Sequence, residues 1–308
     1  MGTVPLRRHG AQHTLATAVT TRGIGVHGGL PVTLTLRPAP PDSGLVFVRS
    51  DLDPAVARVP ARSQQVVDTR LSTVLANAHG TRVGTVEHLL AALAACAIDN
   101  LVIELDGAEV PILDGSAAHW MALLDAAGRI AQAAPRRVLR VLAPVRVHDG
   151  DKWALLRPAP LARFEVGIDF EHPAIGRQRH ALTLDTEAFR HEVAAARTFG
   201  FVRDIEALRA QGLARGGSYD NAIVLGEHGV LNPGGLRYAN EFARHKLLDC
   251  IGDLYLAGAP ILADVLTHKG GHGLNHALLT ALFASPAAWC WEPPGIDAIA
   301  AAADLRAA

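Results

Sequence analysis

The order in which strand-like and helix-like segments follow one another limits the fold of this chain more than any other feature of its sequence. Residues 32–36 alternate Val or Leu with Thr, which is the pattern of a half-buried strand. Residues 45–48 and 101–105 are further short apolar runs of strand type. The segment 85–97 is rich in Leu and Ala and predicts a strong helix, and a second helix is expected over 116–127. The first half of the chain therefore combines strands with two helices.

The second half repeats this order. Strands are expected at 137–141, 154–157, 164–170 and 261–267, and helices at 186–195, at 241–257 and from about Asn275 onward. The segment 131–137 reads AQAAPRR and is predicted to be a linker. Strands followed by paired helices, twice over, favour an α+β fold of two domains with a similar plan. We place the first domain at residues 1–130 and the second at 137–308.

The composition is that of a globular chain with a mainly aliphatic core. Hydrophobic residues make up 49% of the 308 residues and charged residues 19%, whereas aromatic residues make up only 5%. The formal net charge of -1 argues against a nucleic-acid-binding protein, because such proteins usually carry a basic surface. No run of about 18 apolar residues is present. We therefore expect no membrane span, although transient contact with a membrane surface is compatible with the sequence.

The three cysteines indicate a reducing compartment. Cys96, Cys250 and Cys290 are odd in number and form no CxxC motif, unlike a disulfide framework. The N-terminal residues carry charges with no apolar run behind them, unlike a secretory signal peptide. We expect a cytoplasmic protein and take it to be a monomer.

A histidine and an aspartate four residues apart point to a metal site. In the segment FARHKLLDCIGD, residues 242–253, His245 and Asp249 occupy positions i and i+4 of the expected helix, so both side chains project from one face. Imidazole and carboxylate are ordinary zinc ligands, and a catalytic zinc takes three protein ligands plus water. Asp253 continues the same face and is suited to orient a ligand from behind. Surface ion pairs and buried hydrogen bonds also use this spacing, but apolar neighbours indicate that the helix is partly buried.

The start of the helix at 85–97 carries the next candidates. Glu87 and His88 follow Thr85, a residue suited to cap this helix. One interpretation is a polar first turn in which Glu87 favours the helix dipole. The other is that His88 supplies a third metal ligand and Glu87 acts as general base on water, since zinc lowers the pKa of bound water to about 7. A Glu beside a His also occurs in the HExxH zinc motif, which this chain lacks.

A glycine-rich segment, KGGHGLN at residues 269–275, carries a histidine in its middle. The glycines permit tight turns, and a loop before a helix accounts for them but not for His272. Because the pKa of histidine lies near neutral pH, His272 is a candidate general acid that protonates a leaving amine.

The order of the motifs resembles that of a known family over residues 12 to 285. In the first half the matching segments are GIGVHGG (23–29), VTLTLRPAP (32–40), VDTRLSTVL (67–75), TVEHLLAAL (85–93), IDNLVIEL (98–105) and VPILDGSA (110–117). In the second half they are DGDKWA (149–154), HPAIG (172–176), ARTFGFVRDIEAL (196–208), GGSYDNAIV (216–224) and HKLLDCIGDLYLAG (245–258). In this order they are similar to the UDP-3-O-acyl-N-acetylglucosamine deacetylases, zinc enzymes of lipid A (lipopolysaccharide) biosynthesis in Gram-negative bacteria.

The resemblance implies a role for each matching residue. The implied zinc ligands are His88, His245 and Asp249, and the implied general base is Glu87. His272 matches the second catalytic residue, an acid or electrostatic stabiliser, with Asp253 behind it. Thr198 matches a threonine beside the metal that is suited to hydrogen-bond the oxyanion.

The resemblance also implies substrate contacts. Lys246 and Phe199 match positions that contact the sugar nucleotide. An acyl-chain-binding insert is implied at about 199–224, and the substrate-binding candidates within it are Phe201, Ile205 and Ser218. The implied fold has helices sandwiched between two sheets, with the active site at the domain junction.

The resemblance implies zinc-dependent removal of the N-acetyl group of UDP-3-O-acyl-N-acetylglucosamine, the committed step of lipid A biosynthesis. Fe²⁺ is an alternative metal, because imidazole and carboxylate ligands suit several divalent ions. Three rival interpretations are a zinc amidase acting on another acylated amino sugar, a catalytically silent homologue that binds sugar nucleotides, and a metal-free α+β protein. The complete set of catalytic residue types argues against the silent homologue.

Overall fold

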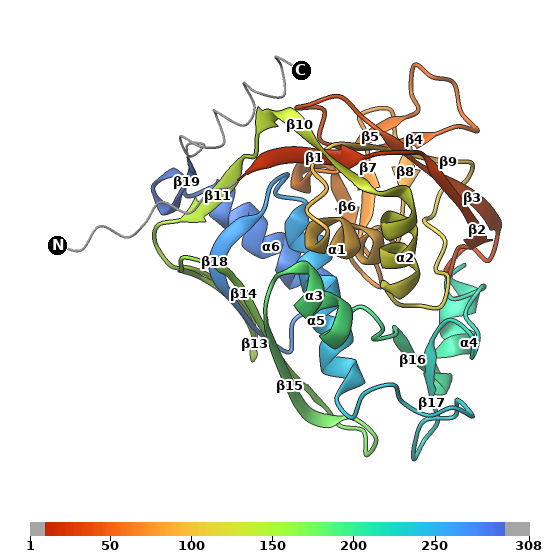
Figure 1. Cartoon of the computed structure of the whole chain (residues 1–308). Coiled ribbons are helices and arrows are strands. Elements are labelled where there is room, and N and C mark those ends of the chain that lie inside the picture. Colours follow the sequence, from red (N-terminus) through yellow and green to blue (C-terminus); the bar gives the residue numbers. More distant parts are fainter. Residues whose placement is uncertain (1–9, 293–308) are drawn as a thin grey trace.

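Helices lie between two β-sheets in the part of the chain that the computed structural model describes, residues 10–292 (Figure 1). The predicted α+β class is confirmed. The elements of the first half are β1 (Ala11–Leu15), β2 (Val19–Ile24), β3 (Pro31–Pro38), β4 (Leu45–Arg49), β5 (Arg58–Pro60), β6 (Val66–Asp68), β7 (Val74–Ala76), β8 (Arg82–Val83), α1 (Glu87–Ala95), β9 (Leu101–Leu105), α2 (Ala118–Ala127) and β10 (Arg129–Pro135).

The second half contains the longest helix and the largest sheet. Its elements are β11 (Val138–Val141), β12 (Val145–Asp149), β13 (Lys152–Pro158), β14 (Ala162–Phe170), β15 (Gly176–Thr183), α3 (Thr186–Glu192), β16 (Phe199–Phe201), α4 (Val202–Ala210), β17 (Ile223–Leu225), α5 (Glu241–Tyr255), β18 (Ile261–His268), α6 (His272–Phe283) and β19 (Trp289–Glu292).

The main sheet of each half is built from strands of that half alone. The first has the order β2-β3-β9-β4-β5, and the alternation in β3 buries Val32, Leu34 and Leu36 while the intervening threonines stay half-exposed. In the second, β18 pairs antiparallel with β13 and parallel with β14. Helices α5 and α6 pack on this second sheet, so its inner face is covered.

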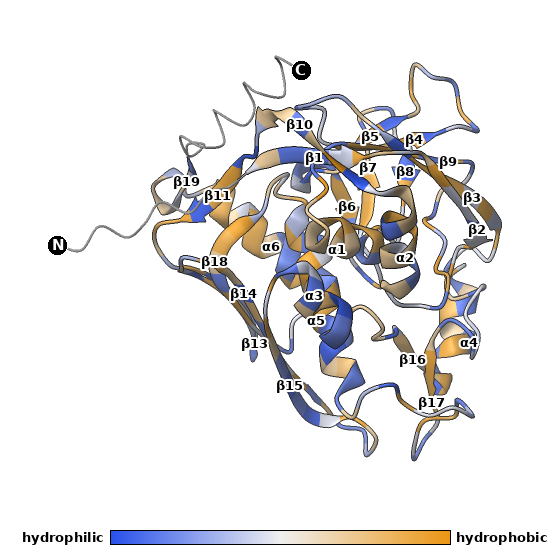
Figure 2. Cartoon of the chain, viewed as in Figure 1, coloured by the Kyte–Doolittle hydropathy of each residue, from blue (hydrophilic) through white to orange (hydrophobic). Residues whose placement is uncertain are grey.

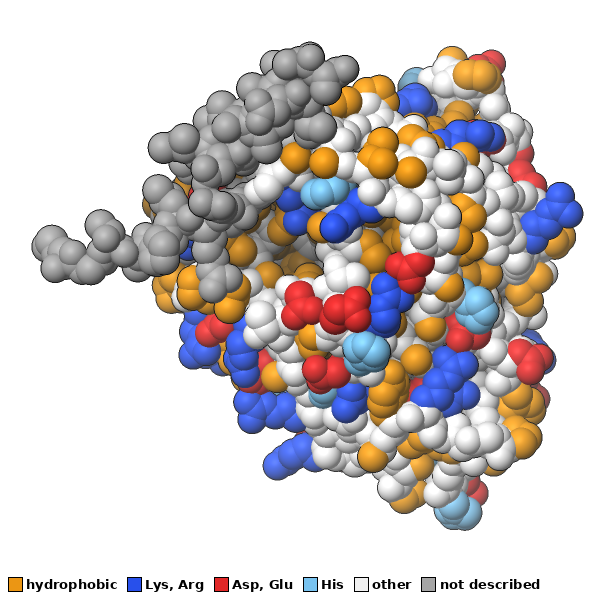
Figure 3. Space-filling model, viewed as in Figure 1, with side chains coloured by type: hydrophobic (Ala, Val, Ile, Leu, Met, Phe, Trp, Pro, Cys, Tyr) orange, Lys and Arg blue, Asp and Glu red, His pale blue; other side chains and the backbone are white. Residues whose placement is uncertain are grey.

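The hydrophobic residues gather where the layers meet. Figure 2 shows that α1, α6 and β18 are largely hydrophobic, whereas the outer strands are mixed. Figure 3 shows acidic and basic side chains together over α2 and α3, where Arg190 pairs with Asp125 at 2.7 Å. Among the described residues, no helix is both long and apolar enough to cross a bilayer.

The segment 131–137, which we expected to be a linker, is mostly strand. Residues up to Pro135 belong to β10, which pairs antiparallel with β1. This strand contains a polar residue, Gln132, that is buried. The Gln132 amide donates to Ala39 O at 2.8 Å, and its oxygen accepts a hydrogen bond from Asn100 at 2.7 Å. A prediction from composition does not identify a polar side chain that is buried and fully hydrogen-bonded in the fold.

Three helix boundaries also differ from the prediction. Helix α1 begins at Glu87, and Thr85 is not its cap, because Thr85 has a φ of 55° and its hydroxyl donates to Glu109 instead. Helix α6 begins at His272, three residues before the position expected. Helix α3 ends at Glu192, so the predicted last turn up to residue 195 is absent. Local patterns locate helix ends least reliably.

Helices α1 and α5 cross with their backbones in contact. Gly252 in α5 lies against the first turn of α1, and a Cβ atom at this position would overlap with the carbonyl oxygen of Glu87. Only glycine therefore allows this approach. The contact places Glu87 and His88 beside the middle of α5, where His245 and Asp249 lie.

We expect Gly252→Ala to destabilise the protein by about 2 kcal/mol, because overpacking a tight contact outweighs the gain of about 1 kcal/mol in helix propensity. Urea denaturation measures this change. The matched control is Gly234→Ala, whose Cβ would meet open space and should stay within about 0.5 kcal/mol of the parent. Equal stability of Gly252→Ala and the parent would contradict the proposed backbone contact.

Candidate metal centre

Three predicted ligands from two helices converge on one point. The ligand atoms of His88, His245 and Asp249 all lie within 4.8 Å of one another, and all three residues are buried. Asp249 Oδ1 is 3.3 Å from His245 Nε2 and 3.6 Å from His88 Nε2. The two imidazole rings meet edge to face with centroids 4.9 Å apart. The i,i+4 pair of α5 and the first turn of α1 thus form a single cluster.

The protonation pattern of this cluster fits a metal ion. His245 Nδ1 lies 3.1 Å from the carbonyl oxygen of Ala196 and donates its N–H there, which leaves the Nε2 lone pair facing Asp249. Burial lowers the pKa of His245 to about 3, so the ring is neutral as a metal ligand must be. Asp249 Oδ1 is buried and accepts no hydrogen bond among the described residues. A cation between these atoms would satisfy all of them.

Lys246 holds the other oxygen of the aspartate. Its ammonium group donates to Asp249 Oδ2 at 2.9 Å. Although burial opposes ionisation, the ammonium group of Lys246 helps to hold the pKa of Asp249 well below its usual range. The same ammonium group lies 5.7 Å from the centre of the Phe199 ring. Lys246 therefore orients the Asp249 carboxylate and also lines the adjoining cavity.

Glu87 is a buried carboxylate beside the metal ligands. Its Oε2 accepts the backbone N–H of Thr73 at 3.1 Å, and its Oε1 is 3.7 Å from His272 Nε2. Burial raises the pKa of Glu87, which moves this carboxylate towards the range useful for a general base at neutral pH.

His272 lies beside Glu87 and is held by Asp253. Its Nδ1 donates to Asp253 Oδ2 at 2.8 Å. Burial alone would lower the pKa of His272, but the carboxylates of Asp253 and Glu87 outweigh it and raise the pKa to about 9. His272 therefore carries a proton at neutral pH, as a general acid requires.

Two residues of this network were missed in the sequence. Thr73 donates its hydroxyl to Asp253 Oδ1 at 2.5 Å, and Asn275 donates its amide to Asp253 Oδ2 at 2.8 Å. Asn275 was recognisable from its i+3 spacing after His272 on α6. Thr73 has no such relation in the sequence, because it comes from a loop near β7 and meets Asp253 only in the folded chain.

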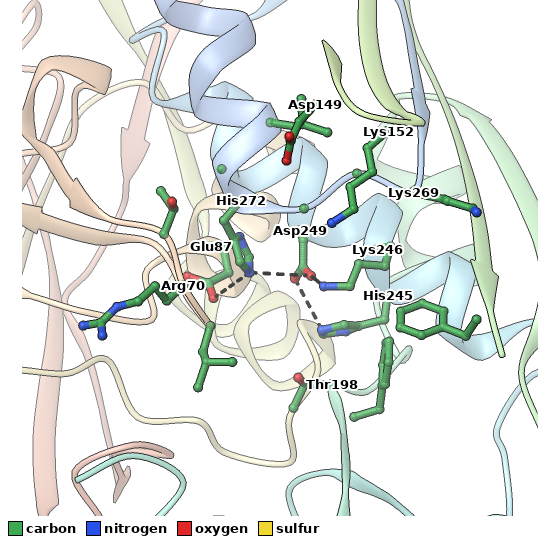
Figure 4. Close-up of a pocket in the computed structure, with 18 of the residues that line it drawn as sticks. Arg70, Glu87, Asp149, Lys152, Thr198, His245, Lys246, Asp249, Lys269 and His272 are labelled. Atoms are coloured by element: carbon green, nitrogen blue, oxygen red, sulfur yellow. Dashed lines mark hydrogen bonds and ion pairs between the residues drawn. The ribbon is translucent and has the colours of Figure 1, made fainter. Parts of the chain in front are cut away.

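A polar cavity of about 380 Å³ opens on one side of the cluster. Figure 4 shows Lys246 beside Asp249, and Lys152 and Lys269 on the same side of the centre. Arg70 lies across the site, beyond Glu87, and Thr198 lies below the ligands. The cavity is therefore suited to a ligand that carries negative charge.

A second, apolar cavity of about 330 Å³ adjoins the cluster. Phe201, Ile205 and Ser218, which were predicted to contact substrate, line this cavity and lie away from the polar one. Phe199 and Thr198 line both cavities, as Glu87 and His88 do. The two cavities therefore meet at Glu87 and His88, beside the other two candidate ligands.

A buried cluster of two histidines and a carboxylate, a further buried carboxylate and a protonated histidine together define a metal-dependent hydrolase. Comparison with known proteins identifies the family of hydrolases to which the chain belongs. A family model described as UDP-3-O-acyl N-acetylglycosamine deacetylase matches residues 12–284, and the chain belongs to this family.

Similar proteins carry the same description. The chain is 52% identical over 280 residues to the UDP-3-O-acyl-N-acetylglucosamine deacetylase of Shewanella baltica strain OS155, which covers 90% of this chain and 91% of the relative. Proteins of the same name from Shewanella sp. strain W3-18-1 and strain ANA-3 are 52% and 51% identical over the same shares of both chains.

We expect Asp249→Asn to lower the affinity for a divalent metal by more than about tenfold, because a neutral amide replaces an anionic ligand. Metal analysis after dialysis measures the loss. Asp264→Asn is the control, since the partly exposed side chain of Asp264 pairs with Arg157 and its loss should leave the metal content unchanged. Full metal content in Asp249→Asn would remove Asp249 from the ligand set.

Proposed function

We propose that this chain hydrolyses the N-acetyl group of UDP-3-O-acyl-N-acetylglucosamine to acetate and the free amine, the committed step of lipid A biosynthesis. One observation carries the proposal: the cluster of metal-ligand residues lies where a cationic polar cavity meets an apolar one. The proposed substrate has a matching division, with a diphosphate on one side of its amide and an acyl chain on the other. The names of the relatives support this assignment.

We propose zinc as the metal, held by His88, His245 and Asp249, with Fe²⁺ as an alternative for the same ligand types. When bound, such a metal polarises an amide carbonyl and lowers the pKa of water to about 7. The neutral ring of His245 and the buried Oδ1 of Asp249, which accepts no hydrogen bond within residues 10–292, support this placement.

The proton transfers are assigned to two neighbouring side chains, Glu87 and His272, whose Oε1 and Nε2 atoms lie 3.7 Å apart. Glu87 takes the proton from the attacking water, because its raised pKa suits a base. His272 donates a proton to the leaving amine, and Asp253 fixes its ring by accepting the Nδ1 hydrogen. Thr198, on the far side of the ligands from the lysines, is assigned the hydrogen bond to the oxyanion.

The substrate is assigned to the two cavities by charge and polarity. Phe199, which lines both cavities, and Lys246, which lines the polar one, are assigned contacts with the sugar nucleotide. Lys246 can interact with phosphate through its remaining ammonium hydrogens. The acyl chain enters the apolar cavity, whose lining includes Phe201, Ile205 and Ser218.

We also propose two domains, with the boundary after Pro135 because β10 pairs with β1. No sheet among the described residues combines strands from both sides of this boundary. A cytoplasmic location and a monomeric state stay predictions, which cell fractionation and light scattering test. The free thiols of Cys96, Cys250 and Cys290 are compatible with a reducing compartment.

We expect Glu87→Gln to lower kcat by about 10²- to 10⁴-fold while the metal content stays that of the parent, since an amide cannot accept the proton of water. Steady-state kinetics with metal analysis measures both. The control is Glu227→Gln, a side chain that is 88% exposed. If kcat in Glu87→Gln equals that of the parent, Glu87 is not the base.

The direct test of the function is an assay of acetate release from UDP-3-O-acyl-N-acetylglucosamine by the metal-loaded protein. We expect turnover that a chelator abolishes and added Zn²⁺ restores, because the ligands hold the metal that activates water. Metal-loaded protein that releases no acetate would refute the proposed function.

A further inference from the structure

Glu109 accepts three hydrogen bonds from two separate parts of the chain. Its Oε1 accepts the backbone N–H of His27 at 2.9 Å and the hydroxyl of Thr85 at 2.9 Å, and its Oε2 accepts the backbone N–H of Gly28 at 2.8 Å. All these donors are neutral, and no ion pair of Glu109 with a cationic side chain is found in residues 10–292. The carboxylate thus acts as a clamp between the residues before α1 and the segment 23–29, which comprises the end of β2 and the turn after it and is called the loop 23–29 below.

The loop 23–29 is shaped to receive this carboxylate. Gly25 faces it closely, and a Cβ atom on Gly25 would overlap with the Glu109 carboxylate. Thr85, on the other side of the clamp, has a φ of 55°, a conformation that costs a β-branched residue energy. The hydrogen bond to Glu109 helps to hold this conformation, so the clamp fixes both attached segments.

The same loop is bonded to the segment 212–217 of the second half. Arg215 N–H donates to His27 O at 3.1 Å, and Gly216 N–H donates to Val26 O at 3.0 Å. A Cβ atom on Gly216 would overlap with the carbonyl oxygen of Gly25. The position of one loop therefore determines the position of the other.

Both loops form walls of the apolar cavity. Val26 and His27 line it from the loop 23–29, and Ala214, Gly217 and Ser218 line it from the other side. Glu109 is not among the lining residues. Its carboxylate acts on the cavity only through the two loops that it holds.

We propose that Glu109 is a positioning residue that sets the length of acyl chain this enzyme accepts, by fixing the loop 23–29 against the segment 212–217. This proposal rests on the proposed function, because it takes the apolar cavity as the acyl site. Each methylene that is buried in the cavity strengthens binding of the acyl chain about fourfold. A cavity wall that is held in place therefore discriminates strongly between acyl chains of different length. A wall released from Glu109 adapts to longer chains and discriminates less.

The test variant is Glu109→Gln, and the matched control is Glu104→Gln. A carboxamide keeps the size of the side chain but turns an NH₂ donor towards one of the backbone N–H donors, so at least one hydrogen bond is lost. Glu104 lies five positions earlier and pairs with the half-exposed Arg37 away from the cavity. A second variant, Gly216→Ala, disturbs the same loop contact from the insert side and leaves the Glu109–Thr85 bond in place.

Two measurements are made on the metal-loaded full chain. The first is amide hydrogen exchange over residues 23–29, which should be faster in Glu109→Gln and unchanged in Glu104→Gln. The second is the ratio of kcat/KM between the preferred acyl chain and one longer by four methylenes. We expect this ratio to fall by about tenfold or more in Glu109→Gln and in Gly216→Ala, while turnover of the preferred substrate shows that both variants are folded.

The outcomes separate the specificity role from the function. Unchanged exchange in Glu109→Gln would overturn the clamp, and faster exchange with an unchanged length ratio would overturn the specificity role. A ratio that falls in Glu109→Gln but not in Gly216→Ala would assign the effect to the start of α1 and refute the loop mechanism. If the parent protein itself releases no acetate, the proposed function fails, and the exchange data still report on the clamp.

Discussion

The contact between Gly252 and the carbonyl oxygen of Glu87 is the constraint on which the site depends. It lets α1 and α5 approach with their backbones in contact, closer than larger residues permit. The metal-ligand residues come from both helices, and their ligand atoms converge within 4.8 Å only because of this crossing. Packing of the aliphatic core around the two helices then holds the crossing in place.

The electrostatics of the centre follow from this geometry. Three buried carboxylates, Glu87, Asp249 and Asp253, meet two cations, Lys246 and His272. Burying carboxylates without sufficient positive charge is unfavourable, and a divalent metal between Asp249, His88 and His245 would correct the imbalance. The same burial raises the pKa of Glu87, whereas Asp253 and Glu87 raise that of His272 against the effect of burial. A divalent metal at this cluster would therefore both stabilise the buried carboxylates and supply what hydrolysis requires.

The accuracy of the sequence-based predictions depended on how local each feature is. Strand β3 and helix α5 were recognisable because alternation and apolar content are local properties. Strand β10 was mistaken for a linker because its polar Gln132 is satisfied by Asn100 and Ala39, which are distant in sequence. Thr73 escaped notice for the same reason, since its partner Asp253 lies 180 positions away.

The sequence by itself determined the α+β class, the helical pair His245 and Asp249, and, through the order of its motifs, the family. Each of these depends on residues that are close together or on their order along the chain. The tertiary structure decided how His88 joins the pair, how Asp253 orients His272, and how Glu109 holds two loops against the apolar cavity. These relations depend on distances between segments far apart in the chain, and packing sets such distances.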